Sequence, residues 1–144
     1  MSASTELQSQ SATITASDSW ILLFARLSIV PLYFYSGVGK VLAFNATAGR
    51  LNGWADGFGS ALAAGAIAVE LVGGAALLLG LFTRQAAVAL ILFTVAATVM
   101  FHNFWAAPEA QIVPQTINFL KNLGLIGALA LVASQGPGRY AVRR

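Results

Sequence analysis

The stretch Ala64–Gly80, "AGAIAVELVGGAALLLG", places one carboxylate, Glu70, in the middle of a run that is otherwise apolar or glycine. A helix needs roughly 20 such residues to cross the hydrocarbon core of a bilayer, and this run with its flanks reaches that length. A charged side chain near the bilayer midplane costs about 2.5–3.5 kcal/mol on insertion scales. Glu70 is therefore expected to be protonated or to lie beside a cation.

The whole chain has the composition of a membrane protein. Of its 144 residues, 58% are hydrophobic and only 9% are charged, whereas soluble domains carry about 25% charged residues. The apolar runs are continuous and do not show the alternation of barrel strands. The sequence thus predicts an all-α protein, an integral membrane four-helix bundle. The expected spans are about 20–44, 60–80, 84–104 and 117–134.

The spans define one domain at 19–135, flanked by a polar, disordered N-terminal tail at 1–18 and a basic C-terminal tail at 136–144. Four spans bring both termini to the same side of the membrane. Arginines are enriched on that side, which favours the cytoplasm by the positive-inside rule. Arg84, in the short turn between the second and third spans, is interpreted as a topology anchor.

Several function classes are disfavoured by residue counts. The chain has no cysteine, which removes disulfides, thiol chemistry and iron–sulfur ligation. One histidine without cysteine does not supply the usual ligands of a structural zinc, so no metal site is expected. The net charge of +3 comes from scattered residues and is not a nucleic-acid signal. No covalently bound cofactor is expected either.

Each predicted helix carries one polar or small face, because residues three and four apart lie on the same side. In a membrane, such faces turn toward the bundle interior. Together they predict a polar seam inside the bundle. Its polar members are Arg26, Tyr33 and Lys40 on the first helix, Glu70 on the second, Thr94, Thr98 and His102 on the third, and Asn118, Lys121 and Asn122 on the fourth.

Two interpretations of Glu70 follow. It is either a structural ion-pair partner or a proton-accepting group beside a redox ligand, which would make it a catalytic residue. Counting helix rise places Arg26 as the nearer cation in depth, so an Arg26–Glu70 pair is the first expectation. Lys40 and Lys121 are the alternatives if the seam holds water.

Four residues gather near the opposite membrane boundary, namely Lys40, His102, Lys121 and Asn122. They form either a pocket for an anion or a quinone head group, or a set of boundary residues with structural roles. In the second interpretation the lysines snorkel toward the surface, and His102 bonds Asn122 or water. A metal or haem role for His102 is a further alternative, and bis-histidine haem would need a second chain.

The order and spacing of four segments give the chain a family resemblance. They are "SGVGKVLAF", "VELVGGAALLLGLFTR", "FHNFW" and "INFLKNLGLIGAL", within the range from about Phe24 to Val132. The chain resembles the DoxX family of small four-helix membrane proteins. The resemblance implies a multi-pass protein of the bacterial inner membrane, similar to the small membrane subunit of thiosulfate:quinone oxidoreductases. It points to Lys40, Glu70, Arg84, His102, Lys121 and Asn122.

The leading hypothesis is therefore a membrane subunit of a quinone-linked redox system, although the chain contains no complete catalytic constellation. A non-catalytic scaffold that recruits a partner protein is the alternative, and a small-solute transporter is a third option that would require oligomerisation. The expected partners are the lipid bilayer and either other membrane or redox proteins or further copies of the chain.

Overall fold

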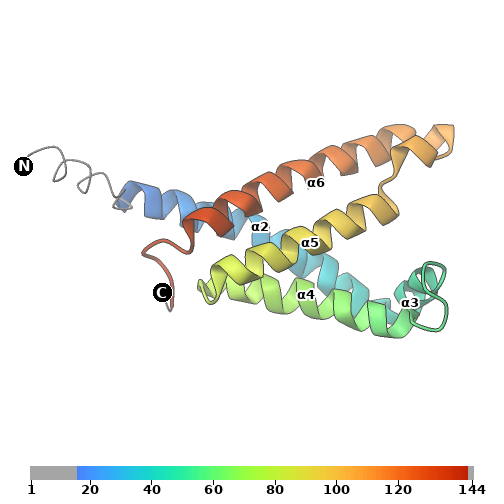
Figure 1. Cartoon of the computed structure of the whole chain (residues 1–144), viewed down its shortest axis with the longest axis horizontal. Helices are drawn as coiled ribbons and strands as arrows, with labels where there is room; N and C mark the ends of the chain where they lie inside the picture. The colour runs from blue at the N-terminus through green and yellow to red at the C-terminus, as the bar shows by residue number, and fades with distance from the viewer. Residues whose placement is uncertain (1–15, 143–144) are drawn as a thin grey trace, which may run out of the picture.

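The computed structural model describes residues 16–142, and all regular structure in that range is helical (Figure 1). Four of the helices are long and apolar enough to cross a membrane, which confirms the predicted all-α architecture with four spans. The elements are α2 (Ala16–Leu42), α3 (Phe44–Asn52), α4 (Gly59–Leu79), α5 (Thr83–Phe101), the 3-10 helix η1 (Phe104–Ala106) and α6 (Glu109–Gln135).

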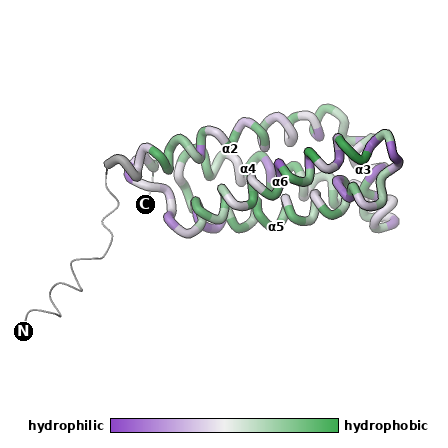
Figure 2. Tube along the Cα trace, turned by 90° about the horizontal axis from the view of Figure 1, so that it is seen from above, coloured by the Kyte–Doolittle hydropathy of each residue, from purple (hydrophilic) through white to green (hydrophobic). Residues whose placement is uncertain are grey.

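The four long helices run side by side, with α2 against α4, α4 against α5, and α5 against α6. A smaller contact between α6 and α2 completes the bundle. Hydrophobic residues follow the long helices along their length, and many hydrophilic residues lie around α3 (Figure 2). Large side chains such as Val72 and Leu92 are exposed on the outside, as expected for a surface that faces lipid. The buried core includes Ile29, Leu77, Leu90, Leu129 and Val132.

Both ends of the described chain lie at the same end of the bundle. The backbone N–H of Arg139 donates to Ser19 Oγ at 3.3 Å, and the rings of Trp20 and Tyr140 are 4.4 Å apart. The predicted return of the chain to its starting side is thereby confirmed for the described residues. That this side is the cytoplasmic one stays a prediction.

The turn from α4 to α5 is short because Gly80 adopts a left-handed conformation with φ of 73°. The N–H of Gly80 donates to Leu77 O at 3.2 Å, and that of Leu81 donates to Ala76 O at 2.9 Å. This pattern satisfies the last carbonyls of a helix and stops it sharply. The short turn expected between the second and third spans thus makes α4 and α5 antiparallel neighbours.

The connection between the first two expected spans is partly helical. It contains α3, which packs on the start of α4 through Ala48 and Leu51. The contact is close because a side chain on Gly59 would collide with the carbonyl of Ala48. Asn52 Oδ1 accepts from the N–H of Gly57 at 2.9 Å and so organises the chain between the two helices. Packing against α4 thus stabilises a helix in the polar stretch Phe44–Asn52.

The fourth span begins at Glu109, ahead of the expected position 117. Pro108 and Pro114 both lie between the expected third and fourth spans. Pro108 immediately precedes the helix, and Glu109 lies in its first turn, where a negative charge is favoured by the helix dipole. Pro114 lies inside the helix, where it removes only the bond to the carbonyl four residues before it.

The predicted tails have different outcomes. Positions 1–15 of the expected N-terminal tail lie outside the described residues, and residues 16–18 already belong to α2. The C-terminal segment 136–142 does not leave the bundle as a free tail. It folds back so that the N–H of Val142 donates to Leu79 O at 2.8 Å, and it covers the adjoining ends of α2 and α4.

Candidate functional site

The buried carboxylate of Glu70 is paired with Lys40. Lys40 Nζ lies 2.9 Å from both carboxylate oxygens of Glu70 and 2.6 Å from Ser36 Oγ. The Glu70 side chain is 3% exposed, whereas that of Lys40 is 27% exposed. The pair therefore joins α2 to α4 in the interior but opens toward the outside at its lysine.

The expected Arg26–Glu70 pair is wrong. Arg26 is fully buried and donates instead to the backbone carbonyls of Leu77, at 3.1 Å, and of Tyr140. The reason lies in the direction of helical side chains, whose Cα–Cβ bonds tilt toward the helix N-terminus. On α2 this tilt carries Arg26 away from Glu70 and carries Lys40 toward it. Helix rise gives only the depth of each Cα atom and not the direction in which its side chain tilts.

Gly37 allows α2 and α4 to approach closely beside the ion pair. A methyl group at Gly37 would lie 2.7 Å from Leu71 Cδ2 and 3.3 Å from Glu70 Cβ. One turn further along α4, a methyl at Gly73 would lie 3.1 Å from the Leu90 side chain on α5. The small face predicted for the second helix is thus the face that meets α2 and α5, which confirms the prediction.

A line of hydroxyl and amide groups crosses the bundle from α2 to α6. Tyr33 Oη and Thr94 Oγ1 are 2.6 Å apart, and both residues are buried. One turn along α5, Thr98 Oγ1 donates to the Thr94 carbonyl at 2.6 Å. The Asn122 amide then donates to Thr98 Oγ1 at 2.9 Å. The polar seam is therefore present, as two interhelical bonds joined by one bond within α5 rather than as one cluster.

The four boundary residues do not form the single pocket that was expected. His102 ends α5 and its Nδ1 lies 2.9 Å from Gln115 Oε1, not beside Asn122. Asn122 bonds Thr98, and Lys121 is exposed on the outside of α6. Adjacent helical positions differ by about 100° in direction, so Asn122 and Lys121 cannot both face the seam.

Gln115 was missed as a partner of His102 because it lies before the expected start of the fourth span at position 117. Once α6 begins at Glu109, Gln115 faces the end of α5 and the hydrogen bond follows. Ser36 was missed as well, although its position four residues before Lys40 places the two on one helix face. Within residues 16–142, no group of three or more His, Cys, Asp or Glu side chains could hold a metal ion.

The end of the bundle where the described chain begins and ends holds three further arginines, Arg26, Arg84 and Arg139. Arg84 is exposed near the start of α5, where a topology anchor would lie. Arg26 is buried nearby under the segment 136–142, and its Nε has no hydrogen-bond partner. This fold-back was not predicted, since only Gly136 and Gly138, which both adopt positive φ, hint at a reversal of the chain.

Known proteins provide an independent comparison. The DoxX family model matches residues 21–103. Inner membrane protein YphA of Escherichia coli (strain K12) is 31% identical over 124 residues, which cover 86% of this chain and 89% of YphA. Inner membrane protein YqjF of the same organism is 30% identical over 123 residues, which cover 85% of this chain and 89% of YqjF. No solved structure matches the chain.

Proposed function

The chain belongs to the DoxX family, and from this premise we propose that this multi-pass inner membrane protein is the membrane subunit of a quinone-linked redox system. The observation that carries the proposal is the ion pair of Lys40 and Glu70. Ionisable groups inside membrane-spanning segments are costly, and they commonly mark ligand sites or proton relays. This pair lies on an inner helix face and reaches the outside only through Lys40.

The side chains around Lys40 suit the polar head of a quinone. Its ammonium has three donors, of which two are directed to Glu70 and one to Ser36. A quinone carbonyl would replace the Ser36 hydroxyl as the third acceptor, and the pair with Glu70 would be kept. The ring of Phe93 lies 5.9 Å from Nζ and offers an apolar wall for a flat ring.

The division of chemistry follows from the residues available. A bound quinone supplies the redox chemistry, taking up two electrons and two protons on reduction to the quinol. Lys40 would orient the head through one carbonyl oxygen, and Glu70 would hold or accept a proton at its carboxylate. The electrons would pass to or from a partner oxidoreductase, because this chain has no cysteine and a single histidine.

The test is quinone content measured by mass spectrometry of lipid extracts from protein purified in mild detergent. We expect near-stoichiometric quinone with the wild type and background levels with Glu70→Gln. Glu109→Gln removes an exposed carboxylate from the start of α6 and serves as the matched control, which should retain quinone. Equal quinone in the wild type and Glu70→Gln would overturn the proposed site.

One observation favours a second candidate function, that of a non-catalytic scaffold. All three donors of Lys40 are already satisfied within the bundle, and Gly37 packs α2 tightly on α4 at the same level. In that role the pair only fixes two helices, and the outer surface recruits a partner protein. Background quinone in every preparation, the wild type included, would favour this function.

A further inference from the structure

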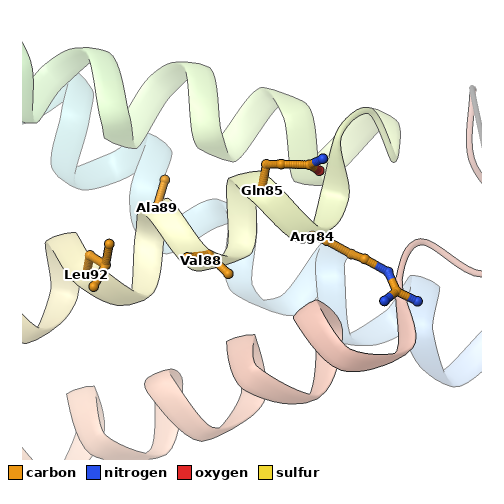
Figure 3. Close-up of a pocket in the computed structure, with 5 residues that line it drawn as sticks. All are labelled: Arg84, Gln85, Val88, Ala89 and Leu92. Atoms are coloured by element: carbon orange, nitrogen blue, oxygen red, sulfur yellow. The ribbon is translucent and has the colours of Figure 1, made fainter.

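A shallow hollow on the outer surface of α5 has the chemical layout of a lipid site. Its lining residues all come from the first half of this helix, with polar side chains at the helix start and apolar ones beyond (Figure 3). They are Arg84, Gln85, Val88, Ala89 and Leu92. Nothing in the proposed redox function uses this surface.

The spacing of the lining residues gives the hollow its direction. Arg84, Val88 and Leu92 are four residues apart, so they form a stripe along one helix face. The stripe is about 12 Å long at the rise of an α-helix. Val88 and Leu92 are exposed within the membrane-spanning part of α5, and the small side chain of Ala89 leaves the depression beside them. The floor is thus apolar, and its charged end lies at the membrane boundary.

The guanidinium of Arg84 has a neighbour in the backbone but no described counter-charge. It lies beside Gly136, where an added methyl group would come within 3.4 Å of Nε. Figure 3 shows the side chain extending from the start of α5 toward the chain that follows α6. Within residues 16–142, Arg84 makes no hydrogen bond or ion pair. Its donors therefore remain available to an external acceptor.

The surroundings of Arg84 favour an anion. Arg26 and Arg139 lie at the same end of the bundle; the Arg26 guanidinium donates to neutral backbone carbonyls, and Arg139 donates to Ser19 Oγ only through its backbone N–H. The carboxylates whose side chains the structure describes lie elsewhere: Glu70 is paired with Lys40, and Asp56 and Glu109 belong to the opposite end. The positive charge of Arg84 thus has no described carboxylate beside it, and it lies next to an apolar groove.

We propose that this groove binds one anionic phospholipid of the surrounding bilayer. Arg84 holds the phosphate, because the planar fork of a guanidinium matches phosphate oxygens with two parallel hydrogen bonds. Gln85 adds a neutral donor, and an acyl chain lies over Val88 and Leu92. A soluble anion would leave the apolar floor uncovered, whereas a neutral lipid would leave Arg84 without a counter-charge. Basic pockets at membrane boundaries are known to select anionic head groups in this way.

The experiment is native mass spectrometry of the delipidated full-length protein titrated with phosphatidylglycerol or with phosphatidylcholine of the same acyl chains. We expect the first phosphatidylglycerol to bind about fivefold more tightly than phosphatidylcholine, the effect of one arginine near an anionic head group. Arg84→Gln should reduce this preference to near unity. Arg50→Gln, at an exposed arginine in α3 on the opposite end, is the matched control and should keep it.

A second variant tests the apolar part of the groove. Ala89→Phe fills the hollow on an exposed helix face without entering the core, so it should weaken the first binding event for both lipids. Wild-type phosphatidylglycerol affinity in both Arg84→Gln and Ala89→Phe would overturn the proposal. Equal weakening by Arg84→Gln and Arg50→Gln would overturn it as well, because the effect would then reflect net charge alone.

Discussion

Helix α2 carries two cations on its inner face, the buried Arg26 and the partly exposed Lys40, and the bundle compensates them in opposite ways. Lys40 faces the carboxylate of Glu70, in the middle of α4. Arg26 faces no carboxylate and donates to the carbonyls of Leu77 and Tyr140. The difference follows from depth along α4, because backbone carbonyls in the last turn lack the regular helical partner four residues on. Leu77 O accepts only the 3.2 Å bond from the N–H of Gly80 at the turn, and its second lone pair accepts from Arg26.

The last turn of α4 therefore acts as the counter-charge for Arg26. The carbonyl ends of a helix carry a partial negative charge, and arginine side chains commonly bond to them. Leu77 lies in that turn, and the fold-back segment adds the carbonyl of Tyr140. Burial of a cation thus needs an ionised partner only where the neighbouring backbone has no free acceptor.

Breaking the ion pair should have the largest effect on stability. Glu70→Leu leaves the Lys40 ammonium without its carboxylate in an apolar setting, and removal of one partner of a buried pair costs about 3–5 kcal/mol. Because Lys40 is partly exposed, we expect a loss of about 3 kcal/mol. The measurement is the free energy of unfolding in mixed micelles titrated with a denaturing detergent.

The double variant Lys40→Met with Glu70→Leu provides the control for this prediction. With both charges removed, apolar side chains of similar length replace the pair, and such replacements are often neutral. We expect stability within about 1 kcal/mol of the wild type. A double variant as unstable as Glu70→Leu alone would show that the shape of the two side chains, and not the stranded charge, sets the loss.

The sequence was sufficient for the features that depend on local periodicity. Long apolar runs predicted four spans, and the 3.6-residue period predicted that Arg26, Tyr33 and Glu70 would face inward, as their burial confirms. Element boundaries failed where packing decides them. The helix α3 exists because Gly59 lets it lie directly on α4, a contact between residues that no local pattern connects.

The partners within the seam were harder to predict than its members. The pairing of Lys40 with Glu70 depends on the N-terminal tilt of side chains as well as on depth, so a fuller use of helix geometry could have found it. The carbonyl of Tyr140 could not have been found in this way. Its contact with Arg26 spans most of the chain and requires left-handed backbone at Gly136 and Gly138.

Removing the fold-back segment should have an intermediate effect. Deletion of residues 139–144 takes the Tyr140 carbonyl from Arg26, and hydrogen bonds to charged groups contribute about 1.5–3 kcal/mol. The same deletion admits water, which replaces part of that bond, so we expect a loss of about 1–2 kcal/mol in the same unfolding measurement. A loss as large as that of Glu70→Leu would contradict the expectation that the C-terminal segment stabilises the bundle less than the Lys40–Glu70 ion pair does.

Tyr140→Ala separates the two contributions of this residue. It removes the ring that contacts Trp20 but keeps the backbone carbonyl that accepts from Arg26. Its effect should be smaller than that of the deletion, about 1 kcal/mol for one aromatic contact. An effect equal to that of the deletion would assign the stability of this end to the ring and not to the arginine bond.

The smallest effect is expected midway between the two cations, at Tyr33, which is seven residues from each of them on α2. Tyr33→Phe removes a neutral hydrogen bond to Thr94, which keeps its bond to the carbonyl of Leu90. No buried group is left without a partner, so the loss should be at the low end for a neutral hydrogen bond, about 0.5 kcal/mol. Thr94→Val in the same double-mutant cycle should show a coupling of similar size with Tyr33→Phe. A loss near that of Glu70→Leu would instead mean that Tyr33 supports the ion pair, and the two charged regions would then form one network.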